Sequence, residues 1–165
     1  MSGTATPPRR ILVVANETVA SDILHVAIRA QAHAAAGSQV LVVAPALNPR
    51  MRHWLSDDDD ARLAARLRLE SCLDRLVAAG VDAEGLVGDA DPVQAVEDAL
   101  RVFRADSLVI STHPEGRSNW LARDLVARAT DRFGLPTTHI VVDSVTGSAT
   151  LASSGVAVTP TMAAA

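Results

Sequence analysis

Lysine and tyrosine are absent from this 165-residue sequence, and cysteine occurs once. All 15 basic residues are arginines, which excludes a phosphate-binding lysine loop, a Schiff-base lysine and a lysine general base. The two tryptophans and two phenylalanines are too few for an aromatic platform that stacks single-stranded nucleic acid. Because Cys72 has no second cysteine to pair with, the sequence favours a protein of the reducing cytoplasm.

Charge, hydropathy and residue spacing argue against nucleic acid, a membrane and a metal ion as binding partners. The net charge of −4 disfavours nucleic-acid binding as the main task. No apolar run approaches the ~20 residues that a membrane-spanning helix needs. The five histidines lack metal-ligand spacing, and the acidic run 57–60 is interpreted as a solvated helix start, because consecutive side chains fan around a helix. We therefore predict no nucleic-acid partner, no membrane contact and no metal site.

The apolar residues form short continuous runs instead of alternating with polar ones. Continuous runs are typical of parallel strands that are buried on both faces of a sheet. The predicted strands cover residues 11–15, 40–44, 81–87, 107–110 and 139–142, the third of them at a sheet edge.

Between these runs, apolar residues recur at helical spacing. Helices are predicted from about residue 21 to 37, and over 56–80, 92–103 and 120–133. The first is predicted to bury Ile23, Ala27, Ala30 and Ala34. Strict alternation of strand and helix implies an α/β fold, a three-layer α/β/α sandwich with a five-stranded parallel, doubly wound sheet.

One domain is predicted over residues 10–143. Residues 1–9 contain prolines without periodicity and are expected to form a flexible arm, and residues 144–165 are small and weakly patterned, as in a disordered tail. Open parallel sheets bind ligands beyond the carboxyl ends of the strands, where the strand order reverses. The turn over residues 112–119 is expected to lie at such an end.

Three segments resemble the universal stress protein family. They are ILVVA followed by polar residues 16–18, GDADPVQAVEDALRVFRADSLVIST at 88–112, and FGLPTTHIVVD at 133–143. The resemblance covers residues 10–143 and implies an adenine nucleotide alpha hydrolase-like, Rossmann-like fold. It also implies a cytoplasmic stress-response or regulatory module without enzymatic turnover, and a homodimer formed through the strand around His139 to Asp143.

Nucleotide-binding members of that family carry a glycine signature after the fourth strand: Gly, two residues, Gly, nine residues, Gly, then Ser or Thr. Aligned backwards from Pro136, this chain has Ser111, Pro114 and Arg123 at the glycine positions and Asp124 at the hydroxyl position, with the spacing one residue short. Pro114 lacks the N–H donor, and the carboxylate of Asp124 repels phosphate. The acidic residue that the family associates with the base corresponds to Asn16. The usual ATP cradle is therefore not predicted.

An adenine nucleotide such as ATP could still bind through other contacts. Gly116 permits a tight turn, Arg117 offers two parallel donors, and Ser118 can cap the following helix. The predicted contacts are Asn16, Thr18, Ser111, Gly116, Arg117 and Ser118. A small nucleotide-utilising enzyme is the remaining alternative. No catalytic residues are identifiable for it, because His113 is interpreted as structural or solvated and Cys72 as a packing residue.

Overall fold

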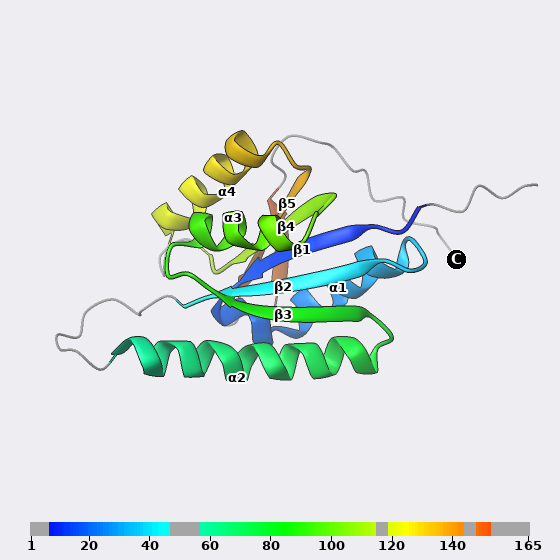
Figure 1. The fold of residues 1–165 in the computed structure, drawn as a ribbon, viewed down its shortest axis with the longest axis horizontal. Coiled ribbons are helices and arrows are strands. Elements are labelled where there is room, and N and C mark those ends of the chain that lie inside the picture. Colours follow the sequence, from blue (N-terminus) through cyan, green and yellow to red (C-terminus); the bar gives the residue numbers. More distant parts are fainter. Residues whose placement is uncertain (1–6, 47–56, 115–118, 144–147, 153–165) are drawn as a thin grey trace, which may run out of the picture.

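Strands and helices alternate along the chain, as the sequence predicts (Figure 1). The computed structural model describes residues 7–46, 57–114, 119–143 and 148–152. The elements are β1 (Arg10–Ala15), the short 3-10 helix η1 (Glu17–Ala20), α1 (Asp22–His33), β2 (Gln39–Pro45), α2 (Asp57–Ala78), β3 (Asp82–Gly88), α3 (Pro92–Val102), β4 (Ser107–Thr112), α4 (Asn119–Phe133), β5 (Thr137–Asp143) and β6 (Ser148–Ala152).

The sheet has the strand order β3-β2-β1-β4-β5-β6. The first five strands of this order are parallel, so the prediction of a doubly wound α/β fold is confirmed. The third strand along the chain, β3, lies at an edge, also as predicted. Because β1 has β2 on one side and β4 on the other, the strand order reverses between β1 and β4.

The sixth strand corrects the expectation of a wholly disordered tail. It also covers the edge of the strand through which the resemblance implied a dimer. Residues 148–152 belong to the segment predicted as a disordered tail, yet they pair antiparallel with β5, with Ile140 opposite Leu151. Small residues give a weak local strand signal, whereas pairing satisfies the backbone groups along β5. Consequently β5 has neighbours on both sides and its edge is not exposed. Residues 1–6 and 153–165 of the predicted arm and tail lie outside the described residues.

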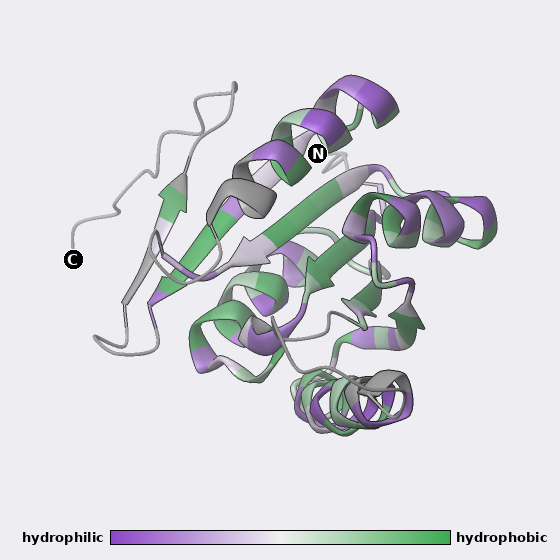
Figure 2. Ribbon diagram, turned by 90° about the vertical axis from the view of Figure 1, so that its left-hand side faces the viewer, coloured by the Kyte–Doolittle hydropathy of each residue, from purple (hydrophilic) through white to green (hydrophobic). Residues whose placement is uncertain are grey.

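The sheet is buried on both faces, which explains its continuous apolar runs. In β1, Ile11 and Val13 face a core shared with α1 and α2, while Leu12 and Val14 face a core shared with α3 and α4. Figure 2 shows the hydrophobic strands between two layers of helices. No helix in the described ranges is long and apolar enough to cross a membrane.

Helix α1 buries a different stripe from the predicted one. Leu24, Ile28 and Ala32 are buried, whereas the predicted residues Ile23, Ala27, Ala30 and Ala34 are partly or fully exposed. Both stripes have helical spacing in this alanine-rich segment. The stripe that packs on the sheet removes both a leucine and an isoleucine from water, so it buries more apolar area.

Two glycines let helices approach the edge strand β3 closely. A Cβ atom on Gly85 would lie 2.6 Å from Cδ1 of Leu73 in α2. One on Gly88 would lie 2.6 Å from Cβ of Ala95 in α3 and 2.9 Å from Cγ1 of Val43 in β2. Such distances are too short for a real Cβ, so a side chain at Gly85 would displace Leu73, and one at Gly88 would push against Ala95 and Val43.

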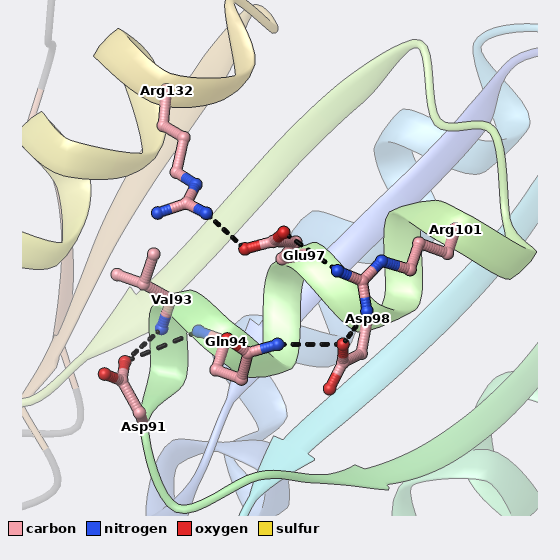
Figure 3. A network of polar contacts seen from close by, with 7 residues as sticks. All are labelled: Asp91, Val93, Gln94, Glu97, Asp98, Arg101 and Arg132. Atoms are coloured by element: carbon pink, nitrogen blue, oxygen red, sulfur yellow. Dashed lines mark hydrogen bonds and ion pairs between the residues drawn. The ribbon is translucent and has the colours of Figure 1, made fainter.

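Helix α3 begins at a side-chain cap and is tied to α4 by charges (Figure 3). Oδ1 of Asp91 accepts a 2.8 Å hydrogen bond from the backbone N–H of Val93. Further along, Glu97 accepts from Arg101 of the same helix and from Arg132 of α4. Exposed pairs of this kind contribute up to about 1 kcal/mol each, and they account for these charges without a ligand.

Substitution of Gly88 tests the close packing of α3 on the sheet. Gly88→Ala is expected to lower the free energy of unfolding by about 1–3 kcal/mol, because the new methyl group overpacks the contact with Ala95. Urea unfolding followed by circular dichroism measures the change. Ala90→Ser, an exposed change in the same loop, is the control. An unchanged unfolding midpoint in Gly88→Ala would contradict the packing role.

Candidate functional site

The candidate site lies where the strand order reverses, at the carboxyl ends of β1 and β4. Ala15 at the end of β1 is the register partner of Ser111 in β4. Beyond these residues the chain turns into η1 on one side and toward Thr112 and His113 on the other. Helices α1 and α4 then cover opposite faces of the sheet, so the two connections diverge. In open α/β sheets a ligand crevice is expected at this point, and the region between the ends of β1 and β4 is called the crevice below.

Three of the predicted site residues come together there. Thr18, which is 2% exposed, donates a 3.3 Å hydrogen bond from its hydroxyl to the backbone carbonyl of Ser111. This hydrogen bond holds η1 against β4, so the Thr18 hydroxyl has a structural role. Ser111 is 6% exposed, and its own hydroxyl has no hydrogen-bond partner in the described part of the chain. Asn16 lies between β1 and η1.

Arg68 is a member of the cluster that the sequence analysis missed. Its Nη2 atom donates a 3.1 Å hydrogen bond to Oδ1 of Asn16, from helix α2 across to the end of β1. On α2, Arg68 directly precedes Leu69, which is buried together with Ala65 and Cys72 as one stripe. A charged residue beside such a stripe is the signal that could have identified it.

The histidine that directly follows β4 lies on this side of the crevice. Nε2 of His113 lies 3.3 Å from Oε2 of Glu17 in η1. The His113 side chain is 16% exposed and that of Glu17 is 61% exposed, so the carboxylate lies toward solvent. Both ring nitrogens of His113 are buried, and neither makes a hydrogen bond within the described ranges. The arrangement leaves His113 partly buried beside a carboxylate, which favours a polar role over a merely solvated one.

The cluster extends to the neighbouring strand β5. Nε2 of His139 lies 2.8 Å from the hydroxyl of Thr112. Burial lowers the pKa of His139, because a low-dielectric surrounding disfavours the charged ring. A neutral imidazole here can donate to Thr112 or accept from it, and it brings no positive charge to the site.

The remaining predicted contacts, Gly116, Arg117 and Ser118, lie outside the described residues, so their role stays a prediction. Cys72 is fully buried, and burial raises the pKa of its thiol to about 11. The thiol therefore keeps its proton near neutral pH, in agreement with a packing residue. Within the described ranges, no group of three or more His, Cys, Asp or Glu side chains could hold a metal ion.

The chemistry that this arrangement offers is binding by hydrogen-bond donors. Arg68 can only donate, while Ser111 and the His113 ring can donate or accept. Among the described residues, no base hydrogen-bonds to the hydroxyl of Ser111. The hydroxyl of Thr112 does lie 2.8 Å from Nε2 of His139, and nucleophilic catalysis requires a base within such reach. The donors of Ser111 and Arg68 suit the recognition of a ligand.

Comparison with known proteins relates the chain to others through its fold. No protein-family model and no curated protein matches the sequence. Among solved structures, a universal stress protein family protein from Arabidopsis thaliana with AMP bound matches with a TM-score of 0.54 at 16% identity, over 84% of this chain and 95% of that chain.

Two microbial structures match similarly. A universal stress protein from Archaeoglobus fulgidus has a TM-score of 0.55 at 20% identity, over 81% of this chain and 98% of that one. A universal stress protein family protein from Burkholderia pseudomallei has a TM-score of 0.58 at 19% identity, over 84% of this chain and 98% of that one. These matches confirm the resemblance to the universal stress protein family at the level of the fold.

Proposed function

We propose that this protein is a cytoplasmic regulatory module of the universal stress protein type that acts by binding and not by turnover. The supporting observation is that the hydroxyl of Ser111 and Nε of Arg68 are buried and have no hydrogen-bond partner in the described part of the chain. His113 contacts Glu17. Buried polar groups without partners are costly, and a bound ligand would satisfy them. The cytoplasmic part of the proposal follows from the single buried cysteine.

A second candidate function is the binding of an adenine nucleotide in the same crevice. It is favoured by one observation outside this chain, that the Arabidopsis thaliana structure with this fold has AMP bound. The contacts in this chain would come from Asn16 and Ser111, with Gly116, Arg117 and Ser118 after β4. Thr18 is the sixth predicted contact. Its hydroxyl donates to the carbonyl of Ser111, so it would act by holding η1 and β4 in place.

We also propose that the module is a homodimer, joined at the outer edge of β6. The expected interface strand, β5, already pairs with β6, so the free edges of the described sheet are β3 and β6. Edge strand β3 carries Asp82 and Glu84, and like charges oppose pairing with a second copy. Strand β6 has no charged residue, and its Leu151 is 69% exposed. Such an edge favours pairing.

Absence of turnover is tested with ATP. Full-length protein incubated with millimolar ATP is expected to release no phosphate or ADP above the rate without protein, because among the described residues no base hydrogen-bonds to the Ser111 hydroxyl. Coupled phosphate detection and chromatography measure both products. Release that scales with protein concentration and disappears in Ser111→Ala would contradict the proposal, and a heat-denatured sample is the control.

Nucleotide binding is tested by Arg117→Ala. If the guanidinium of Arg117 contacts phosphate, its removal is expected to weaken AMP and ATP binding at least several-fold in calorimetric titrations. Arg128→Ala, at an exposed position of α4, is the matched control because, among the described residues, its side chain pairs with Asp124. Equal affinities of the wild type and Arg117→Ala would rule out this contact.

The dimer is tested at Leu151. Leu151→Arg is expected to convert dimers into monomers, because two-fold pairing of β6 brings two new positive charges together. Light scattering after size-exclusion chromatography measures the mass, and circular dichroism checks the fold. Val77→Arg places the same charge at an exposed position of α2 and should leave the dimer intact. A monomeric wild type, or a dimeric Leu151→Arg, would show that β6 is not the interface.

A further inference from the structure

We propose that Arg68 selects the ligand of this crevice, and that it does so by binding an acceptor oxygen, either of a phosphate group or of an oxo-substituted base such as guanine. This inference rests on the proposed ligand-binding function of the site. It adds a residue from α2, which is not one of the two connections that follow β1 and β4. It also specifies the kind of ligand group to which this residue would donate.

The contact between Arg68 and Asn16 determines which groups remain for a ligand. A guanidinium has only donors, so the atom of Asn16 that contacts Nη2 of Arg68 at 3.1 Å must be the amide oxygen. The other polar group of the Asn16 side chain is its NH₂, which only donates. Because Arg68 already uses one lone pair of the Asn16 oxygen, Asn16 and Arg68 together offer more donors than acceptors to an incoming group.

The charge of Arg68 also lacks compensation. The residue is partly buried, its Nε atom is buried without a hydrogen-bond partner, and no carboxylate pairs with it within the described ranges. Arg75, on the same helix, pairs with Asp22, and Arg132 pairs with Glu97. Removing a cation from water without a counter-charge is unfavourable, so the site favours a ligand that brings negative charge or lone pairs to Arg68.

The other polar groups of the crevice agree with an acceptor ligand. The buried hydroxyl of Ser111, which has no partner, can donate to it. The acidic side chain described at this point is that of Glu17, which is mostly exposed and contacts His113. The carbonyl of Ser111 accepts from Thr18. Around Arg68, Asn16 and Ser111, donors therefore outnumber free acceptors.

This pattern discriminates between purines. Guanine presents two acceptors, O6 and N7, which match the paired donors of an arginine, whereas adenine presents an amino group at the corresponding position. A phosphate oxygen would satisfy the same donors. Adenosine, with neither an oxo group nor a phosphate, should bind least.

The test is a calorimetric titration of the full chain with guanosine, adenosine, GMP, AMP and inorganic phosphate. The expected result is that GMP binds at least ten-fold more tightly than adenosine, since a bidentate contact discriminates by ~1–3 kcal/mol. Tight binding of guanosine would identify the base as the source of the acceptor. Binding of inorganic phosphate, together with equal affinities for GMP and AMP, would identify the phosphate.

Two variants assign the effect to Arg68. Arg68→Met keeps an apolar stem of similar length and should weaken the tightest ligand ten-fold or more. Asn16→Asp, which requires no change in α2, supplies a carboxylate to Arg68 and should weaken that ligand similarly. Arg66→Met, at an exposed position of the same helix, is the control and should bind as the wild type does.

The proposal is overturned if Arg68→Met and Asn16→Asp bind as the wild type does, if adenosine binds as tightly as GMP, or if no compound in the set binds. Binding of AMP that depends on Arg117 and not on Arg68 would overturn this inference and leave nucleotide binding in place. The absence of turnover is judged separately by the ATP assay, so failure of the two proposals is distinguishable.

Discussion

The central strand β1 is the constraint on which the structure depends. It is buried on both faces and lies between β2 and β4 in a parallel sheet. A parallel neighbour requires a crossover, and a strand with two such neighbours sends its crossovers to opposite faces of the sheet. The reversal of strand order beside β1 follows, and with it the crevice at its carboxyl end. The polar cluster of Asn16, Thr18 and Ser111 exists because this strand is central.

In the proposed site, side-chain donors take the place of the backbone donors of a glycine-rich loop. A glycine-rich loop binds phosphate through N–H groups that approach closely because no Cβ intervenes. In this chain Ser111 and Pro114 stand at the first two glycine positions, while Arg68 reaches the end of β1 from α2. The glycines of β3 serve a different purpose, since Gly85 and Gly88 admit the side chains of α2 and α3. These two glycines therefore reflect helix packing on the sheet.

Sequence patterns predicted most elements and missed specific pairings for identifiable reasons. Continuous apolar runs located the five parallel strands, and the third was recognised as an edge because it is the least apolar. The buried face of α1 was mispredicted because alanines make two stripes equivalent until the sheet is in place. Strand β6 was missed because its small residues carry little strand signal, and its stability comes from pairing with β5. Among the predicted contacts, Asn16, Thr18 and Ser111 were chosen at the ends of predicted strands, and the structure places them near the ends of β1 and β4.

The sequence by itself determined the order of elements, the parallel sheet and the end of the sheet where polar residues gather. These properties follow from local periodicity, because each strand or helix records in its own residues which of its faces are buried. The tertiary structure decided which side chains meet. Arg68 and Asn16 are 52 positions apart, and Thr18 and Ser111 are 93 apart. Such contacts depend on the register of neighbouring strands and on the seating of α2 against the sheet, which no local pattern specifies.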